Sequence, residues 1–391
     1  MPESKCVMVP RNLLLKAILV GLCALVMAVT LSAGLWPFSF RIANQVLWRG
    51  ERDGLYFGDT GMAISSGRFS GLPTDQTAGC SLELSVEPRL TEDSSTLLSF
   101  YDASGPVGIA IRQVLDDMVF SRGAGDKRSE RRYKNVFQNY VFEQGRPVQI
   151  TLTSANGRLE IYLDGVLRKS VAGAELKGTD FTGILVLANT PYENLSWTGT
   201  VRGLAIYDHA LGPQEVKQHS AVWRSDREMM RKQGDRPYAL YLFDEGDGAT
   251  LHNLGKAGPD LEIPKNYFIF DPGFLVPFWK EFRPDQAYLK DLAVNVFGLV
   301  PLGVCFAALF AWVAGQRRSL LYTTLLGLSV SLTIEIVQRF IPTRNSGSTD
   351  LITNTLGSAL GAWLYLNAKT QSWLAHWGLV ELKARRQESA D

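Results

Sequence analysis

Acidic and amide side chains occur at matched spacing in front of two apolar stretches. DLAVNVFG begins at Asp291 and DLITNTLG begins at Asp350, so the frame D-L-x-x-N-x-x-G appears twice. In a helix, residues four and seven apart lie on one face, which places Asn354 and Gly357 on the face of Asp350. An ionisable residue at membrane depth costs about 2.5–3.5 kcal/mol on insertion scales, so a carboxylate there indicates function.

Two roles are open for these aspartates. At a helix N-terminus each carboxylate would accept backbone N–H groups and offset the positive end of the helix dipole, which is a structural role. Alternatively, they form a polar site with Glu335 and Gln338 on the preceding apolar stretch. In this site the carboxylates would hold Arg344 in position to bind an anionic group. The predicted polar cluster comprises Asp291, Asn295, Glu335, Gln338, Arg344, Asp350 and Asn354.

Catalysis by this cluster is a second hypothesis, with Glu335 or Asp350 as general base. The sequence holds no H-E-x-x-H, G-x-S-x-G, C-x-x-C or P-loop pattern, and none of its four histidines lies near the cluster. We therefore assign no catalytic residue and leave open whether the protein is an enzyme.

Four apolar stretches predict transmembrane helices that would position the cluster. Residues 17–36 contain 20 residues without a charge, enough to cross ~30 Å of hydrocarbon. A cleaved signal peptide is the alternative, but its apolar core is only about 7–15 residues long. Three further spans are expected within 291–368. They are residues 292–313, 320–341 and 351–368.

Basic residues beside short loops remain in the cytoplasm, and this sets the expected orientation. They occur in 1–16, at Arg317 and Arg318, and in the tail 369–391. Both chain ends are therefore predicted to be cytoplasmic. Residues 37–290 and the loop 342–350 are predicted to lie outside, which places the polar cluster in the outer leaflet.

Residues 50–235 carry short alternating segments separated by turn residues, which predicts an all-β sandwich. GRLEIYLDGVL at 157–167 and WTGTVRGLAIYDHALGPQEV at 197–216 resemble the LamG and concanavalin A-like jelly-roll superfamily. Asp164 is expected in a two-residue hairpin turn, with calcium binding as the alternative. The resemblance implies carbohydrate binding in many members. Tyr192 and Trp197 could stack on a sugar, or could belong to the core.

The segment 236–290 is expected to connect the sandwich to the membrane. Residues 239–264 either complete the sandwich or form a stalk. The stretch NYFIFDPGFLVPFW at 266–279 is too short to span and is interrupted by two prolines. Its aromatic content is typical of the membrane interface, where we expect it to lie.

The last three apolar stretches resemble the VanZ-like membrane family. The resemblance rests on N-x-x-G-x-x-P-L-G at 295–303, E-x-x-Q at 335–338 and D-x-x-x-N-x-x-G-x-x-x-G at 350–361. The glycines would let helices approach closely. The residues expected to serve this helix packing are Pro301, Gly303, Gly357 and Gly361. The family name refers to resistance to a glycopeptide antibiotic that acts on the cell wall, but the large β domain is a departure from the family pattern.

Together these features predict a multi-pass protein of the bacterial inner membrane with an external β sandwich. A net charge of +1 gives no basic surface for nucleic acid, and no cofactor or metal is expected apart from the calcium alternative. The expected ligand is a membrane lipid, an envelope glycan or a lipid-linked sugar, and protein partners are unknown. The alternatives are an intramembrane hydrolase or transferase, and a structural anchor that displays a binding domain.

Overall fold

The computed structural model describes residues 11–50, 53–73, 79–92, 94–102, 108–123, 134–192, 194–232, 236–282 and 286–376. The chain forms two compact units. One unit joins Met1–Phe40 to Gly273–Asp391, and the other is Arg41–Pro272. Parts of the two predicted cytoplasmic ends, residues 1–10 and 377–391, lie outside the described residues.

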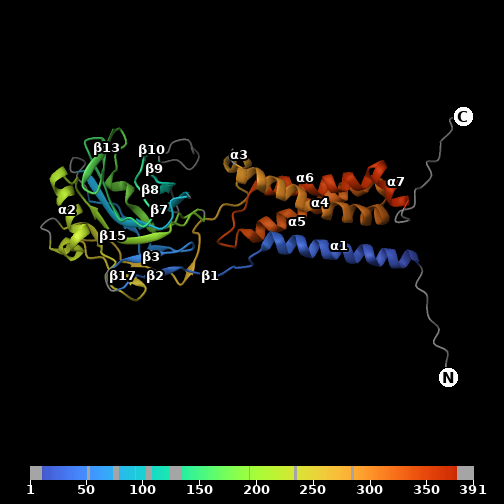
Figure 1. Cartoon of the computed structure of the whole chain (residues 1–391), viewed down its shortest axis with the longest axis horizontal. Helices are drawn as coiled ribbons and strands as arrows, with labels where there is room; N and C mark the ends of the chain where they lie inside the picture. The colour runs from blue at the N-terminus through green and yellow to red at the C-terminus, as the bar shows by residue number, and fades with distance from the viewer. Residues whose placement is uncertain are drawn as a thin grey trace, which may run out of the picture. The chain divides into compact units, whose positions relative to one another are not determined.

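The unit Arg41–Pro272 is a β sandwich of two large antiparallel sheets (Figure 1). The first sheet has the order β10 (Lys134–Gln138), β9 (Asp117–Arg122), β8 (Ile109–Val114), β7 (Ser94–Tyr101), β14 (Thr182–Leu187), β4 (Ala63–Ser65), β18 (Leu261–Glu262) and β17 (Thr250–Leu251), with β5 (Phe69–Ser70) also paired to β14. The second has the order β13 (Val166–Ala172), β12 (Arg158–Leu163), β11 (Val148–Ala155), β6 (Cys80–Pro88), β15 (Gly199–Tyr207), β3 (Leu55–Phe57) and β2 (Val46–Trp48), with β16 (Ala239–Tyr241) also paired to β15.

Alternation of apolar residues explains the sandwich core. Along β8 every second residue is buried, and these side chains meet apolar side chains of the other sheet in one core cluster. Helix α2 (Pro213–Ser225) covers the second sheet through Val216 and Trp223, which pack with Tyr207 of β15. Two 3₁₀ turns, η1 (Gly178–Asp180) and η2 (Arg227–Arg231), complete this unit.

The hairpin between β12 and β13 turns at Asp164 and Gly165. Both residues have positive φ, 51° and 79°, as a two-residue turn requires. Asp164 Oδ1 accepts the backbone N–H of Gln149 at 3.2 Å. The described residues contain no group of three or more His, Cys, Asp or Glu side chains that could hold a metal ion. Asp164 is therefore a turn residue in this structure.

The sandwich extends beyond the predicted range 50–235. Strands β16, β17 and β18 lie within 239–264 and pair with its sheets, so this segment completes the sandwich and is not a stalk. The predicted interfacial stretch 266–279 is divided between the two units. Its first half forms β19 (Asn266–Tyr267), which pairs with β1 (Ile42–Ala43), and Tyr267 is buried in the sandwich.

Cys80 lies in the sandwich core on β6. Burial raises the pKa of its thiol to about 12, and the thiol donates to the Leu176 carbonyl oxygen at 3.3 Å. Cys23, Cys80 and Cys305 are all free and buried. Among the described residues, none of the cysteines forms a disulfide.

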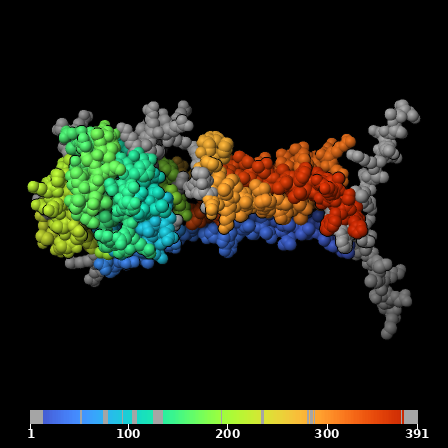
Figure 2. Space-filling model, turned by 45° about the horizontal axis from the view of Figure 1, so that its top comes forward, coloured from blue at the N-terminus to red at the C-terminus, as the bar shows by residue number. Residues whose placement is uncertain are grey.

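The other unit is helical. It contains α1 (Arg11–Leu35), the short α3 (Phe278–Glu281), α4 (Gln286–Ala314), α5 (Gln316–Gln338), α6 (Ser348–Leu366) and α7 (Ala368–His376). Helices α4, α5 and α6 pack against one another, and α1 lies along α4 and α5 (Figures 1 and 2). Aliphatic side chains of α1, α4 and α5 share one core cluster.

Three described helices are long and apolar enough to cross a membrane, whereas the sequence predicts four. They comprise Leu14–Leu35, Tyr288–Ala314 and Gln316–Gln338. The fourth predicted span, α6, does not qualify because polar residues lower its mean hydropathy, and several of these polar side chains are buried. These are Thr349, Thr353, Asn354 and Ser358. Helix α6 packs against both α4 and α5.

Candidate functional site

Glu335 lies near the end of α5 and is buried, with 1% of its surface exposed. Its Oε2 accepts the backbone N–H of Gly347 at 2.8 Å. Gly347 directly precedes the first residue of α6. The carboxylate therefore lies where the partial positive charge of the α6 N-terminus stabilises it. This contact ties the end of α5 to the start of α6 across the loop.

Gln338 and Arg344 connect the same region to the end of α1. Gln338 Nε2 donates to the Gly34 carbonyl oxygen at 2.8 Å. Arg344 Nε and Nη2 donate to the Trp36 carbonyl oxygen at 3.1 and 2.7 Å. The expectation that acidic side chains hold Arg344 is wrong for the described residues, because a backbone carbonyl holds its guanidinium instead. Arg344 remains exposed.

Asp350 and Asn295 join the two repeated frames. Asn295 Nδ2 donates to Asp350 Oδ1 at 2.7 Å, which links α4 to α6. Asp350 lies in the first turn of α6, as a favourable dipole interaction requires. Asp291 differs, because α4 begins at Gln286 and places Asp291 beyond its first turn, in an exposed position. The frames are alike in sequence but not in environment.

Asn354 lies deeper between α5 and α6, with 7% of its surface exposed. Its Nδ2 donates to Ser331 Oγ at 3.1 Å. Its Oδ1 accepts no hydrogen bond from any residue that the structure describes. A buried amide oxygen without a donor is costly, so this atom has the capacity to accept a hydrogen bond from a bound group.

Glycines allow α4 and α6 to approach closely. A Cβ at Gly357 would overlap the Val296 carbonyl oxygen, and one at Gly361 would overlap the Val300 carbonyl oxygen. A Cβ at Gly303 would overlap the Ser358 carbonyl oxygen. Pro301 lies inside α4 between these contacts. The small residues thus bring the α4 and α6 backbones together next to the polar side chains.

The loop between α5 and α6 is fixed by backbone contacts. Val276 forms an isolated bridge with Gly347, and its N–H donates to the Ser346 carbonyl oxygen at 3.0 Å. Leu275 N–H donates to Ser346 Oγ at 3.3 Å. Since Arg344 belongs to this loop, these bonds limit the positions that its guanidinium can take.

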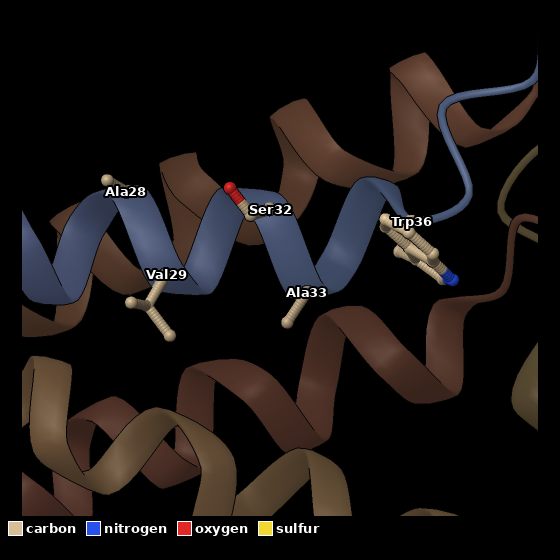
Figure 3. Close-up of a pocket in the computed structure, with 5 residues that line it drawn as sticks. All are labelled: Ala28, Val29, Ser32, Ala33 and Trp36. Carbon is tan, nitrogen blue, oxygen red and sulfur yellow. The ribbon is translucent and has the colours of Figure 1, made fainter.

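A shallow groove lies along α1 (Figure 3). It includes Trp36, whose carbonyl oxygen accepts hydrogen bonds from Arg344. It is lined by Ala28, Val29, Ser32, Ala33 and Trp36. In Figure 3 the Trp36 ring lies at the C-terminal end of α1, beyond the small side chains. The groove is apolar except for one hydroxyl, so it suits a hydrocarbon chain.

The two proposed sugar contacts of the sandwich differ in accessibility. Trp197 is fully buried, and its Nε1 donates to Gln113 Oε1 at 2.6 Å. It belongs to the core and offers no face to a sugar in this structure. Tyr192 is partly exposed and packs edge to face on Tyr101, with ring centroids 5.7 Å apart.

Two protein-family models match parts of the chain. Residues 251–369 match the VanZ/LLP1 family model. Residues 59–217 match the Laminin_G_3 model of the concanavalin A-like lectin/glucanases superfamily. The chain is a membrane protein that combines a VanZ-like segment with a concanavalin A-like domain. The VanZ-like match begins within the sandwich unit, at β17. No curated protein matches the chain significantly.

Solved structures resemble the chain only distantly. The binding domain of botulinum neurotoxin DC with rat synaptotagmin II has 14% identity and a TM-score of 0.35, with coverage of 47% of this chain and 46% of that one. The chain thus covers less than half of that structure. A Limulus polyphemus SAP-like pentraxin has 14% identity and a TM-score of 0.32, with coverage of 42% and 83%. A Bacteroides ovatus protein has 13% identity and a TM-score of 0.39, with coverage of 57% and 58%.

The sequence did not indicate three participants in the polar region. Trp36 and Gly347 take part through backbone atoms, which every residue possesses, so no residue type marks them. Ser331 lies four residues before Glu335 on α5, and this helical spacing is a signal that could have placed it on the same face.

Proposed function

We propose that the protein recognises a lipid-linked envelope glycan, with the anionic headgroup bound at Arg344. The observation that supports this most is the exposed Arg344 guanidinium, fixed on the Trp36 carbonyl at the end of the α1 groove. The Nε–H group and one Nη2 N–H group bond to the protein, which leaves both Nη1 N–H groups and the second Nη2 N–H group for a ligand. Arginine suits phosphate because its planar fork donates to two oxygens at once.

The polar side chains behind Arg344 would position this site. Glu335 and Gln338 connect the ends of α5, α6 and α1, so they hold the loop that carries the arginine. Asp350 and Asn295 are partly exposed and could accept or donate hydrogen bonds to a headgroup. Asn354 Oδ1 is a further acceptor deeper in the unit.

The α1 groove would take the hydrocarbon part of the same ligand. Four of its five lining residues belong to α1, a helix apolar enough to span a membrane, and the fifth, Trp36, directly follows α1. An aromatic residue at the groove end, Trp36, is typical of the boundary between hydrocarbon and headgroups. A chain in the groove would therefore place its phosphate at the level of Arg344.

The sandwich would contact the glycan part of the ligand or an envelope polymer. Its match to the concanavalin A-like lectin/glucanases superfamily supports this assignment, although a fold alone does not determine a ligand. We place the protein in the bacterial inner membrane with both ends cytoplasmic and the sandwich outside. A role in antibiotic or envelope-stress resistance is part of this proposal.

Orientation can be tested with single cysteines at exposed positions. In a Cys6→Ser background whose remaining cysteines are buried, Asn345→Cys should react with an impermeant maleimide in spheroplasts. Gln316→Cys should react only after the cells are opened, because it lies beside Arg317 and Arg318. The reverse labelling pattern would place the polar site at the cytoplasmic face and contradict the proposed topology.

The ligand itself should be found by purifying the intact protein in mild detergent and identifying bound molecules by native mass spectrometry. We expect a phosphate-bearing lipid with attached sugar. Recovery of only bulk membrane phospholipid, at the ratio found in the membrane extract, would contradict specific recognition.

A further inference from the structure

An exposed patch on the sandwich presents apolar side chains to solvent. Tyr140 is 83% exposed, Leu115 is 52% exposed and Phe137 is 51% exposed. Leu115 lies in the turn between β8 and β9, Phe137 lies on the edge strand β10, and Tyr140 follows that strand. Strands β8, β9 and β10 lie side by side in one sheet (Figure 1). The three side chains therefore come from adjacent elements.

Hydrogen bonds hold the backbone of Tyr140 next to the β8–β9 turn. Tyr140 N–H donates to Asp117 Oδ1 at 3.0 Å. The N–H groups of the next two residues, Val141 and Phe142, donate to the Asp116 carbonyl oxygen at 2.8 and 2.9 Å. The segment after β10 is thus fastened to the turn by three hydrogen bonds. Tyr140 is presented from a fixed backbone.

The backbone in this patch is unusual. Leu115 has φ 58° and Tyr140 has φ 57°, a left-handed conformation that bulky residues rarely adopt. Asn156 and Asp164 also have positive φ in the sandwich, but they are turn-forming residue types. The two-residue turn of the β8–β9 hairpin, in which Val114 pairs with Asp117, accounts for the positive φ of Leu115. Tyr140 is neither buried nor in such a turn, so its conformation is the unusual one, and backbone outliers of this kind occur at binding sites.

Asp116 supplies a polar group at the same turn. Its carboxylate is partly exposed and makes no hydrogen bond or ion pair with the residues that the structure describes. At Phe137, the carbonyl oxygen accepts a hydrogen bond from Lys169 Nζ at 2.5 Å. The patch thus combines an exposed aromatic ring, apolar neighbours and a carboxylate that can accept hydroxyl groups.

We infer that this patch binds a neutral saccharide, with a pyranose ring on the face of Tyr140 and its hydroxyls donating to Asp116. The inference rests on the proposed glycan recognition and assigns it a site. The C–H groups on one face of a pyranose carry partial positive charge and favour the negative face of an aromatic ring. The hydroxyls at the ring edge need acceptors, and a carboxylate offers strong ones.

The negative charge of Asp116 and Asp117 also affects which class of glycan can bind. Asp116 and Asp117 lie at the turn that binds the Tyr140 backbone, whereas the Lys169 ammonium lies at the Phe137 carbonyl oxygen. Next to Tyr140 the two negative charges oppose anionic polysaccharides and anionic membrane surfaces. A neutral sugar meets no such repulsion. We therefore expect selectivity for neutral over anionic glycans.

The test uses the intact, detergent-solubilised protein on an array of neutral and anionic oligosaccharides, followed by calorimetric titration of the strongest neutral oligosaccharide. Tyr140→Ala should lower its affinity by at least about tenfold, and Tyr140→Phe should retain most of it because the ring remains. Asp116→Asn should weaken binding less than Tyr140→Ala. Leu47→Ala, at a 65% exposed apolar residue on β2, is the matched control and should bind like the parent.

The outcomes separate this site from the proposed function. If the parent binds neutral glycans and Tyr140→Ala binds equally well, the inferred site is wrong while glycan recognition stands. If the parent binds no oligosaccharide, both the site and the glycan part of the proposed function fail. Binding of anionic oligosaccharides alone would also overturn the inference. Circular dichroism of Tyr140→Ala, expected to match the parent, checks that loss of binding is not loss of fold.

Discussion

Replacing Gly357 with alanine should strongly destabilise the helical unit, whereas the same replacement at Gly298 should not. The two glycines occupy the last position of the repeated frame D-L-x-x-N-x-x-G. At Gly357 a Cβ would overlap the Val296 carbonyl oxygen, while at Gly298 it would meet nothing within 4 Å. The Gly357 obstacle is backbone, so only separation of α4 and α6 can relieve it. Overpacking of this kind costs about 1–3 kcal/mol or more.

Alanine at Gly298 should even stabilise the protein slightly, since glycine inside a helix costs about 0.5–1 kcal/mol relative to alanine. The measurement is thermal unfolding of each purified variant in the same detergent, followed by size-exclusion chromatography. Gly357→Ala should lower the midpoint or yield aggregate, and Gly298→Ala should elute and unfold like the parent. Equal behaviour of the two variants would contradict the close approach of α4 and α6.

The sequence predicts most of the architecture because regular patterns encode it. Alternation along short segments predicts the sandwich, and positions 164 and 165 predict its hairpin turn. Long apolar stretches predict α1, α4 and α5. The stretch 351–368 likewise predicts the helix α6, although its polar residues keep its mean hydropathy below that of the other three helices. Hydropathy alone does not reveal which face a helix buries.

The aromatic residues show where local patterns stop being informative. Tyr267 and Trp279 belong to one aromatic stretch, yet Tyr267 is buried in the sandwich and Trp279 is 66% exposed in the helical unit. Trp197 likewise is buried, and its indole N–H donates to Gln113, which lies 84 residues earlier in the sequence. Such burial depends on long-range strand pairing, which the neighbouring residues do not specify.

The polar region was predicted as a set of residue types, but not as a set of contacts. Asn295 and Asp350 meet as their helical spacing allows. The partner of Arg344 is a carbonyl 308 residues earlier in the chain. Because every residue has a backbone carbonyl, the sequence does not indicate which distant carbonyl accepts these hydrogen bonds. For this reason the sequence suggested carboxylates as the arginine partners.

Replacing Arg344 with alanine should remove the proposed headgroup interaction without unfolding the protein. Arg344 is exposed, so its loss leaves no cavity, and the loop keeps its backbone bonds between Val276 and Ser346. A hydrogen bond to a charged group contributes about 1.5–3 kcal/mol, so ligand affinity should fall by at least about tenfold. Arg344→Lys should bind at an intermediate level because it retains the charge but lacks the planar fork.

Arg339→Ala is the matched control. Arg339 belongs to the same end of α5, but its guanidinium stacks over the Phe274 ring at 5.7 Å and is not part of the proposed site. Its removal changes net charge by the same amount as Arg344→Ala. If the effect were one of general electrostatics, ligand binding would therefore fall equally in both variants. A specific headgroup contact predicts that ligand binding falls only in Arg344→Ala.

The central claim is tested most directly by the molar ratio of bound phosphate-bearing lipid to protein, measured by native mass spectrometry after identical detergent purification. The proposed function predicts a stoichiometric ligand on the parent and on Arg339→Ala, and at least about a tenfold lower occupancy on Arg344→Ala. Equal occupancy on all three proteins would contradict headgroup recognition at Arg344.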